Sequence, residues 1–102
     1  MQINLSSTAI RHLQEIIDSH LEFCGKRSAM KLSNLVDEKL RTLLKFPEFG
    51  APEELLKGRK TLYRSKRINK RYKFIYHIAE DTIIIDAFWD MRMHPNNLVK
   101  RI

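Results

Sequence analysis

The stretch from Thr61 to Trp89 constrains the fold of this chain more than any other, because apolar and polar residues alternate along most of it. From Arg71 onward, aromatic and β-branched side chains occupy every second position, which is the pattern of half-buried β-strands. Glu80 and Asp81 interrupt the alternation where a tight turn would fit. The sequence therefore predicts three antiparallel strands joined by two tight turns.

A loop at Glu80 and Asp81 fixes the register of the two longer strands, because a slip of one residue would move every side chain to the other face. The predicted pairs share one apolar face: Ile78 with Ile83, Tyr76 with Ile85, Phe74 with Ala87, and Tyr72 with Trp89. We expect these side chains to be buried under a cover from elsewhere in the chain.

A turn at Ile68 and Asn69 extends the pairing to the first strand and predicts a basic second face. Tyr63 and Ser65 join the apolar face in this register. The other face collects the cations, with His77 nearby, Arg64 opposite Lys73, and Lys66 opposite Arg71. Because like charges opposite each other destabilise a sheet, the four cations indicate a surface that binds an anion.

An amphipathic helix is predicted near the N-terminus. Gln2 to Leu5 form a candidate short strand, and Ser6 or Ser7 then caps the helix. Its apolar stripe comprises Ile10, Leu13, Ile17 and Leu21. The stripe leaves His12 and His20 on the side that we expect to be solvated.

A second helix is predicted from about Lys26 to Lys45, between Gly25 and Pro47. The two helices form an antiparallel hairpin whose apolar stripes match the need of the sheet for a cover. The second stripe comprises Ala29, Leu32, Val36, Leu40 and Leu43. The expected fold is α+β, with the N-terminal strand and the αα-hairpin packed on an antiparallel sheet.

Two short helical turns are expected outside the hairpin. The loop after Pro47 has room for one turn at Glu53 to Lys57. Pro95 suits the first position of a short terminal helix, because its missing N–H costs nothing there.

The composition limits the class of protein. With 102 residues, 43% of them apolar, the chain is long enough for one domain spanning 1–102 and too short for two. Its 19 Lys and Arg against 12 Asp and Glu give a charge of +7, which favours nucleic acid or an acidic protein as partner.

Cys24 is the only cysteine, which excludes an intramolecular disulfide and a cysteine-rich metal site, and we expect no metal or cofactor. The sequence has no signal-peptide pattern and no apolar run near about eighteen residues. We therefore expect a cytoplasmic protein that does not bind membranes.

Four stretches of the sequence carry a resemblance to a known family when they are taken in order: KFPEFGAPEELLKG at 45–58, YR at 63–64, RYKFIYHIAED at 71–81 and DMRMHPNNL at 90–98. Together they resemble the RelE/ParE superfamily of bacterial toxins over most of the chain. The resemblance implies the toxin of a type II toxin–antitoxin module, neutralised by an acidic antitoxin that wraps around it.

The resemblance leaves the mechanism open. RelE-like members cleave mRNA on the ribosome, ParE-like members inhibit DNA gyrase, and a degenerate member would only bind its antitoxin. The electrostatic argument favours the mRNA interferase, because a basic face can hold RNA and stabilise the phosphorane formed in metal-free cleavage. The implied targets are therefore the ribosome and mRNA, or alternatively gyrase.

The resemblance also implies site residues for an interferase. Lys73 stands at the position of a family arginine, and Arg71 shares its predicted face, so both would stabilise negative charge. Arg92 would orient the phosphate, and His94 or Glu53 would move protons. The predicted nucleic-acid-binding set is Arg64, Lys66, Arg71 and Lys73.

Each candidate also has a purely structural interpretation. Arg71 falls opposite Asp90 and can form a cross-strand ion pair, a contribution of roughly 0.2–1 kcal/mol. Arg92 has Asp86 and Asp90 as possible partners in the predicted sheet. Glu53 suits the start of a helix, where a carboxylate is stabilised by the helix dipole.

Overall fold

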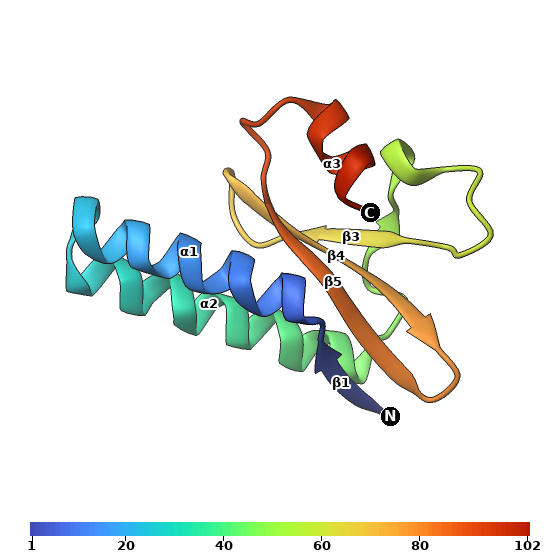
Figure 1. Cartoon of the computed structure of the whole chain (residues 1–102). Coiled ribbons are helices and arrows are strands. Elements are labelled where there is room, and N and C mark those ends of the chain that lie inside the picture. The colour runs from blue at the N-terminus through green and yellow to red at the C-terminus, as the bar shows by residue number, and fades with distance from the viewer.

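The computed structural model describes residues 1–102, except for the side chain of Arg101. Two helices, α1 (Ser7–Cys24) and α2 (Lys26–Lys45), form a hairpin along one side of a twisted sheet (Figure 1). Within the described residues the sheet has five strands in the order β1-β5-β4-β3-β2. The strands are β1 (Gln2–Leu5), β2 (Ala51–Pro52), β3 (Arg64–Arg67), β4 (Tyr72–Ala79) and β5 (Thr82–Asp90). The predicted α+β fold is confirmed.

The hairpin forms where the sequence predicts it. The Ser6 hydroxyl caps α1 and accepts a hydrogen bond from the Ala9 N–H at 3.0 Å. Gly25 joins the helices with φ +90°, a conformation that is easy only for glycine. The buried stripe of α2 agrees with the prediction and comprises Ala29, Leu32, Val36 and Leu43, with Leu40 partly buried.

The buried side of α1 differs from the prediction. Ile10 and Leu21 are 52% and 51% exposed, whereas Ala9 and His12 are buried and His20 is half-buried. α1 packs against β5 as well as α2, and Ala9, which has no side chain beyond Cβ, allows the close approach. Both histidines therefore lie on the packed side, and the expectation that they are solvated is wrong.

The predicted strand at the N-terminus is present as β1, at the edge of the sheet. It runs parallel to β5, with Ile3 opposite Ile83 and Leu5 opposite Ile85. The other three strand pairs are antiparallel, so the sheet is mixed rather than wholly antiparallel.

The register of β4 and β5 follows the prediction only near their turn. Ile78 pairs with Ile83, and Tyr76 with Ile85. A β-bulge at Asp86 then adds one residue to β5, which shifts the later pairs. The predicted pairs of Phe74 with Ala87 and Tyr72 with Trp89 are wrong: the observed pairs are Phe74 with Phe88, Tyr72 with Asp90, and Lys73 with Trp89.

The register of β3 also differs, because the connection to β4 is longer than a two-residue turn and spans residues 68–71. The Asn69 side-chain oxygen closes this turn by accepting the backbone N–H groups of Arg71 and Tyr72 at 2.8 and 2.9 Å. The observed pairs are Arg64 with Tyr76, Ser65 with Ile75, Lys66 with Phe74, and Arg67 with Lys73. Arg64 and Lys66 therefore share a face with the core aromatics, and the predicted gathering of four cations on one face is wrong.

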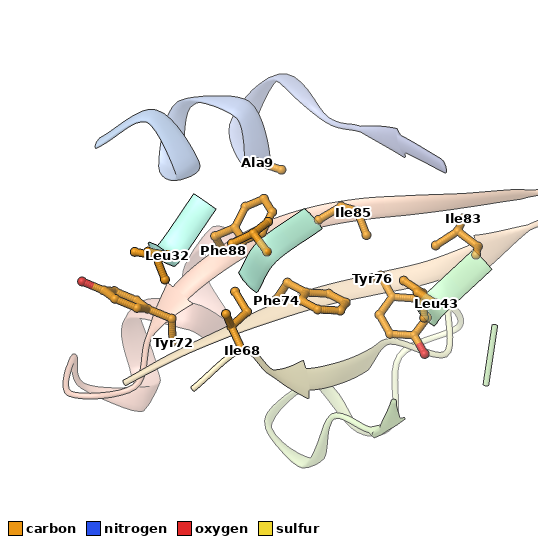
Figure 2. Close-up of a cluster of buried hydrophobic side chains, with 11 residues drawn as sticks. Ala9, Leu32, Leu43, Ile68, Tyr72, Phe74, Tyr76, Ile83, Ile85 and Phe88 are labelled. Atoms are coloured by element: carbon orange, nitrogen blue, oxygen red, sulfur yellow. The ribbon is translucent and has the colours of Figure 1, made fainter. Parts of the chain in front are cut away.

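We call the side of the sheet that carries Phe74 and Tyr76 the hairpin face. Figure 2 shows the core between this face and the helices. Its buried members are Ala9, Leu32, Val36, Leu43, Ile68, Tyr72, Phe74, Tyr76, Ile83, Ile85 and Phe88. The predicted burial of the central aromatic and isoleucine residues is thereby confirmed, but Ile78 is 36% exposed because β4 runs past the last pair of β3 there.

Tyr76 also ties the core to the loop after α2. Its hydroxyl donates to the Pro47 carbonyl oxygen at 2.8 Å and accepts from the Gly50 N–H at 2.9 Å. A Cβ on Gly50 would lie 2.7 Å from the Ser65 carbonyl oxygen and 2.8 Å from the Tyr76 ring. The loop can therefore approach the sheet this closely only with glycine at that position.

We call the opposite side, which carries Ile75 and Trp89, the second face. It is covered by the short 3₁₀ turn η1 (Glu54–Leu56) and the terminal helix α3 (Pro95–Arg101), near the two turns that the sequence predicts. Its buried cluster comprises Leu56, Ile75, Ala87, Trp89 and Leu98. Trp89 is buried as expected, but on this face rather than against the hairpin, because the bulge changes the side to which it points.

Candidate functional site

Lys73 and Glu53 form an ion pair on the second face. Their side chains are only 14% and 6% exposed. Hydrogen bonds fix both the backbone and the side chain of Glu53. Its N–H donates to the Tyr63 carbonyl oxygen at 2.8 Å, and its Oε2 accepts the Leu55 N–H at 3.3 Å. The pair brings two predicted catalytic residues together, but each neutralises the other and both are covered.

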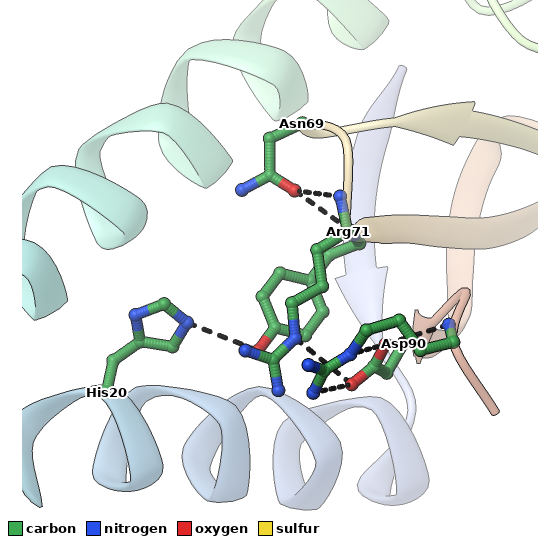
Figure 3. Close-up of polar contacts among 6 residues, drawn as sticks. His20, Asn69, Arg71 and Asp90 are labelled. Carbon is green, nitrogen blue, oxygen red and sulfur yellow. Dashed lines mark hydrogen bonds and ion pairs between the residues drawn. The ribbon is translucent and has the colours of Figure 1, made fainter. Parts of the chain in front are cut away.

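Asp90 gathers two other predicted residues, Arg71 and Arg92 (Figure 3). The Arg71 Nε lies 3.1 Å from Asp90 Oδ2, and the Arg92 Nη2 lies 3.1 Å from the same oxygen. Burial alone would raise the pKa of Asp90, but hydrogen bonds from Arg92 and Arg71 outweigh it and hold the pKa below its usual value. The ion-pair interpretation of both arginines is therefore confirmed.

A chain of polar contacts continues from this cluster into the hairpin. The Arg71 guanidinium lies over the Tyr72 ring, 4.8 Å from its centroid. The Tyr72 hydroxyl is 3.2 Å from His20 Nε2, and His20 Nδ1 is 3.1 Å from Ser28 Oγ. Burial raises the pKa of Tyr72. His20 thus joins both helices to the sheet, a role that its position in a helical pattern could not reveal.

His94 is exposed and caps α3, where its Nδ1 accepts the Asn96 N–H at 3.1 Å. Arg64 and Lys66 lie apart from it, toward the hairpin face. Arg64 donates to the Gly50 carbonyl oxygen at 2.9 Å, and Lys66 lies 4.2 Å from the centroid of the Phe49 ring. The predicted nucleic-acid-binding residues therefore do not form one surface.

Sequence reasoning missed a pair formed by His77 and Asp86. The His77 Nδ1 is 2.7 Å from Asp86 Oδ2, and the Tyr63 ring meets the imidazole edge-on at 5.6 Å between centroids. Burial raises the pKa of Asp86, and the hydrogen bond with His77 opposes the rise. The sequence does contain a signal for this pair, because Asp86 is the one carboxylate inside the apolar run 83–89. A half-buried acid needs a polar partner.

Within the described residues, no group of three or more His, Cys, Asp or Glu side chains is arranged to hold a metal ion. Of the helices described, none has the length and apolar character needed to cross a membrane.

Comparisons with known proteins identify the class of protein. The family model described as the ParE toxin of the type II toxin–antitoxin system parDE matches residues 3–95. The chain therefore belongs to the ParE toxin family. This confirms the predicted superfamily and the class of toxin–antitoxin proteins, and it implies an antitoxin as partner. A comparison with curated protein sequences finds no match.

Solved structures share the fold. A chain of the chromosomal ParDE TA system from P. aeruginosa superposes with a TM-score of 0.72 at 16% identity, over 88% of this chain and 95% of that one. The YoeB/ParE toxin from Agrobacterium tumefaciens gives 0.62 at 17% identity, over 88% and 98%. The YoeB dimer from Staphylococcus aureus gives 0.59 at 20% identity, over 85% and 92%.

Proposed function

We propose that this toxin inhibits DNA gyrase by binding to it, without catalysing a reaction of its own. The observation that supports this proposal is that every predicted catalytic side chain already has a partner within the chain. Lys73 and Glu53 pair with each other, Arg71 and Arg92 share Asp90, and His94 caps α3. The match to the ParE family supports the same mechanism, because gyrase inhibition is what the resemblance implies for ParE-like members.

Metal-free cleavage of RNA makes demands that this arrangement does not meet. A base must reach the 2′-hydroxyl, and cations must face the phosphorane as its charge develops. Glu53 is 6% exposed and its carboxylate is held by Lys73, so it has no access to a hydroxyl group. The same contact neutralises the Lys73 charge, so Lys73 is not free to stabilise a developing negative charge.

Ribosome-dependent mRNA cleavage is the second candidate, and one observation favours it. Two guanidinium groups share the single carboxylate of Asp90, so this cluster retains one positive charge. The Arg92 side chain is 66% exposed, and a guanidinium fork suits a phosphate. His94, two residues farther along the chain, is the nearest proton carrier in sequence.

For the antitoxin partner we propose an acidic segment. Cations such as Lys31, Arg67 and Lys70 are exposed, and the described residues contain no ion-pair partner for them. They are better placed to meet acidic side chains than the four cations expected from the sequence. The affinity of the complex should fall as salt rises, and binding that is indifferent to salt would contradict this proposal.

Two assays on the same purified protein separate the candidate mechanisms. A gyrase inhibitor blocks supercoiling of plasmid DNA and leaves cell-free translation unchanged, which is the expected result. An interferase arrests translation and leaves supercoiling unchanged, which would overturn the gyrase proposal.

An exposed arginine provides a matched test of the second candidate. If translation is arrested, Arg92→Gln should weaken the arrest by about an order of magnitude or more, on the scale of a lost transition-state contact. Arg11→Gln removes the same charge from an exposed position on α1 and should have no effect. If both variants weakened the arrest equally, Arg92 would contribute only its positive charge and not a specific contact with the phosphate.

A further inference from the structure

The apolar stripe of α1 is only partly used by the core. The stripe consists of Ile10, Leu13, Ile17 and Leu21, which share one side of the helix because they recur at steps of three and four residues. Leu13 and Ile17 are half-buried against the hairpin-face cluster, but Ile10 and Leu21 are 52% and 51% exposed. A row of apolar side chains that stays exposed is a mark of an interaction surface.

The stripe lies along the edge of α1 that adjoins α2. His20 Nδ1 is 3.1 Å from Ser28 Oγ of α2. Because the two helices run antiparallel with the same rise per residue, this contact places Leu13 beside Leu35, which is also half-buried. The stripe and Leu35 therefore form a seam between the helices, which we call the outer seam.

No other element covers the outer seam. The hairpin packs on β5 and β1, and Figure 1 shows no helix or strand of the described residues on its far side. A shallow hollow of about 860 Å³ lies over α2, and its lining includes Arg27, Met30 and Leu35. The hairpin therefore presents an apolar ridge on α1 next to a hollow on α2.

The two helices carry opposite charges at the tip of the hairpin. Asp18 and Glu22 are exposed near the end of α1, and Lys26 and Arg27 are exposed at the start of α2. Within the part of the chain that the structure describes, none of these four side chains forms an ion pair. The tip is thus acidic on one side of the seam and basic on the other.

We propose that the outer seam is the interface of a symmetric dimer, in which a second copy of this chain covers it. A twofold axis along the seam places α1 of each copy over α2 of the other and forms a four-helix bundle. The stripe of one copy then lies in the hollow of its partner. Because the axis runs along the helices, tip lies over tip, and the acidic end of α1 meets the basic start of α2 twice.

The charges select this orientation. A twofold axis across the helices would instead place the start of each α2 over the end of the other α2. Both ends are basic, since Lys26 and Arg27 begin the helix and Arg41 and Lys45 lie near its end. Like charges that face each other across an interface cost free energy, so the axis along the seam is the favourable one.

The charges also favour a second copy over an acidic antitoxin segment as the occupant. An acidic segment lying along the seam would be repelled by Asp18 and Glu22. Only a partner that carries both signs matches both sides, and a second copy does so by symmetry. The dimer leaves Arg67 and Lys70, which are exposed outside the hairpin, open to an acidic partner.

The size of the surface limits the affinity. The 18 residues of α1 make a face about 27 Å long and, with two helices side by side, about 20 Å wide. The dimer would therefore bury about 500 Å² on each copy, or about 1,000 Å² in total, which is the lower limit of specific interfaces. We expect a dimer that dissociates on dilution.

The test exchanges the charges of the two sides and measures the dimer by sedimentation velocity. One variant, Asp18→Lys/Glu22→Lys, makes both sides of the tip basic, and the other, Lys26→Glu/Arg27→Glu, makes both sides acidic. Each variant alone should have a dissociation constant at least about tenfold above that of the wild type, because like charges then meet twice. An equimolar mixture should form a heterodimer with an affinity within about threefold of the wild type, because opposite charges meet again at both contacts.

The recovery in the mixture separates contacts between copies from contacts within one hairpin, because each variant chain keeps its own altered tip. Loss of folding is an unsuitable explanation for weak association, since lysine near the end of α1 and glutamate at the start of α2 both suit the helix dipoles. Circular dichroism of each variant checks the helix content.

Matched charge reversals outside the hairpin are the controls. Glu48→Lys/Glu54→Lys and Lys57→Glu/Lys60→Glu change the net charge by the same amounts at exposed positions and should leave the dissociation constant unchanged. Equal weakening by the control variants would overturn the proposal, and so would a mixture that stays monomeric. A wild type that remains monomeric at about 0.5 mM would also overturn it, since even a weak specific interface associates at that concentration.

A separate variant tests the apolar part of the seam. Leu21→Asn removes an exposed apolar side chain from the stripe and should raise the dissociation constant severalfold. Leu62→Asn makes the same change where the leucine is 56% exposed outside the hairpin, and the dimer should be unaffected. Equal dissociation constants for these two variants would show that the stripe is not part of the interface.

Discussion

The two faces of the sheet differ in how they are held. The hairpin face buries a continuous set of aromatic and aliphatic side chains under two long helices, with Phe74 and Tyr76 fully buried. The second face has a smaller cluster, and its cover consists of the turn η1, the short helix α3 and the ion pair of Lys73 with Glu53. Burial of apolar area contributes about 25 cal/mol per Å², whereas a buried ion pair often adds little because both charges must be desolvated.

The hairpin face holds the larger set of buried apolar side chains, and the second face combines a smaller apolar cluster with a covered ion pair. Lys73 and Glu53 could be replaced by apolar residues if only cohesion were required. Four measurements would break or sharpen this contrast.

The largest expected effect is that of Phe74→Ala, on the hairpin face. Removing a fully buried aromatic ring leaves a cavity and should lower the free energy of unfolding by about 3–5 kcal/mol. Urea unfolding followed by circular dichroism measures this loss. Phe46→Ala is the control, because Phe46 is 62% exposed, and a similar loss there would contradict the contrast.

The next effect is that of Leu98→Ala, on the second face. We expect a smaller loss, about 2 kcal/mol, because the cluster around Leu98 is small. Hydrogen exchange should rise in α3 while the amides of β4 and β5 stay protected. Loss of protection throughout the sheet would mean that both faces unfold as one unit; Leu62→Ala serves as the exposed control.

The third effect depends on pH and concerns the His77–Asp86 pair. Burial raises the folded-state pKa of Asp86 above that of an unfolded chain, so folding favours its protonated form. The protonated carboxyl group of Asp86 therefore contributes stability at pH values below its unfolded-state pKa. This contribution is lost as pH rises through its folded-state pKa. The unfolding free energy of the wild type minus that of Asp86→Asn should therefore decrease as pH rises through this window, and Asp18→Asn, the same change at an exposed position of α1, is the control.

The smallest effect is that of Arg71→Gln. Its ion pair with Asp90 is partly exposed, so we expect a loss of about 0.2–1 kcal/mol at neutral pH. The folded pKa of Asp90 is lowered, so the contribution is present above the unfolded pKa and is lost as pH falls through the folded one. Thermal unfolding measures the loss of stability at neutral pH and its disappearance at acidic pH, with Arg11→Gln as the control.

Much of the fold was predictable because its signals are local. The helical hairpin follows from periodicity together with Gly25 and Pro47, and the turn at Glu80 and Asp81 fixes the near half of the β4–β5 register. The motifs at 45–58, 71–81 and 90–98 were enough to indicate the toxin family. The pairing of Arg71 and Arg92 with Asp90 was also accessible, because these residues are close along two paired segments.

The candidate site was less predictable, because its geometry depends on backbone events that have no periodic signal. A single inserted residue at Asp86 moved Trp89 to the second face, and a longer turn at 68–71 moved Arg64 and Lys66 to the hairpin face. Since side chains alternate with a period of two, each odd shift reverses every side chain beyond it.

The sequence by itself determined the helices, the alternating strands, the excess of positive charge and the family of the chain. Only the tertiary structure decided which cations are neutralised, which face Trp89 occupies, and that α3 and Glu53 cover the second face. The physical reason is that local patterns set what each segment becomes, whereas the register and the burial of charges depend on contacts between segments far apart in the chain, such as Lys73 with Glu53 and Ser6 with the bulge at Asp86.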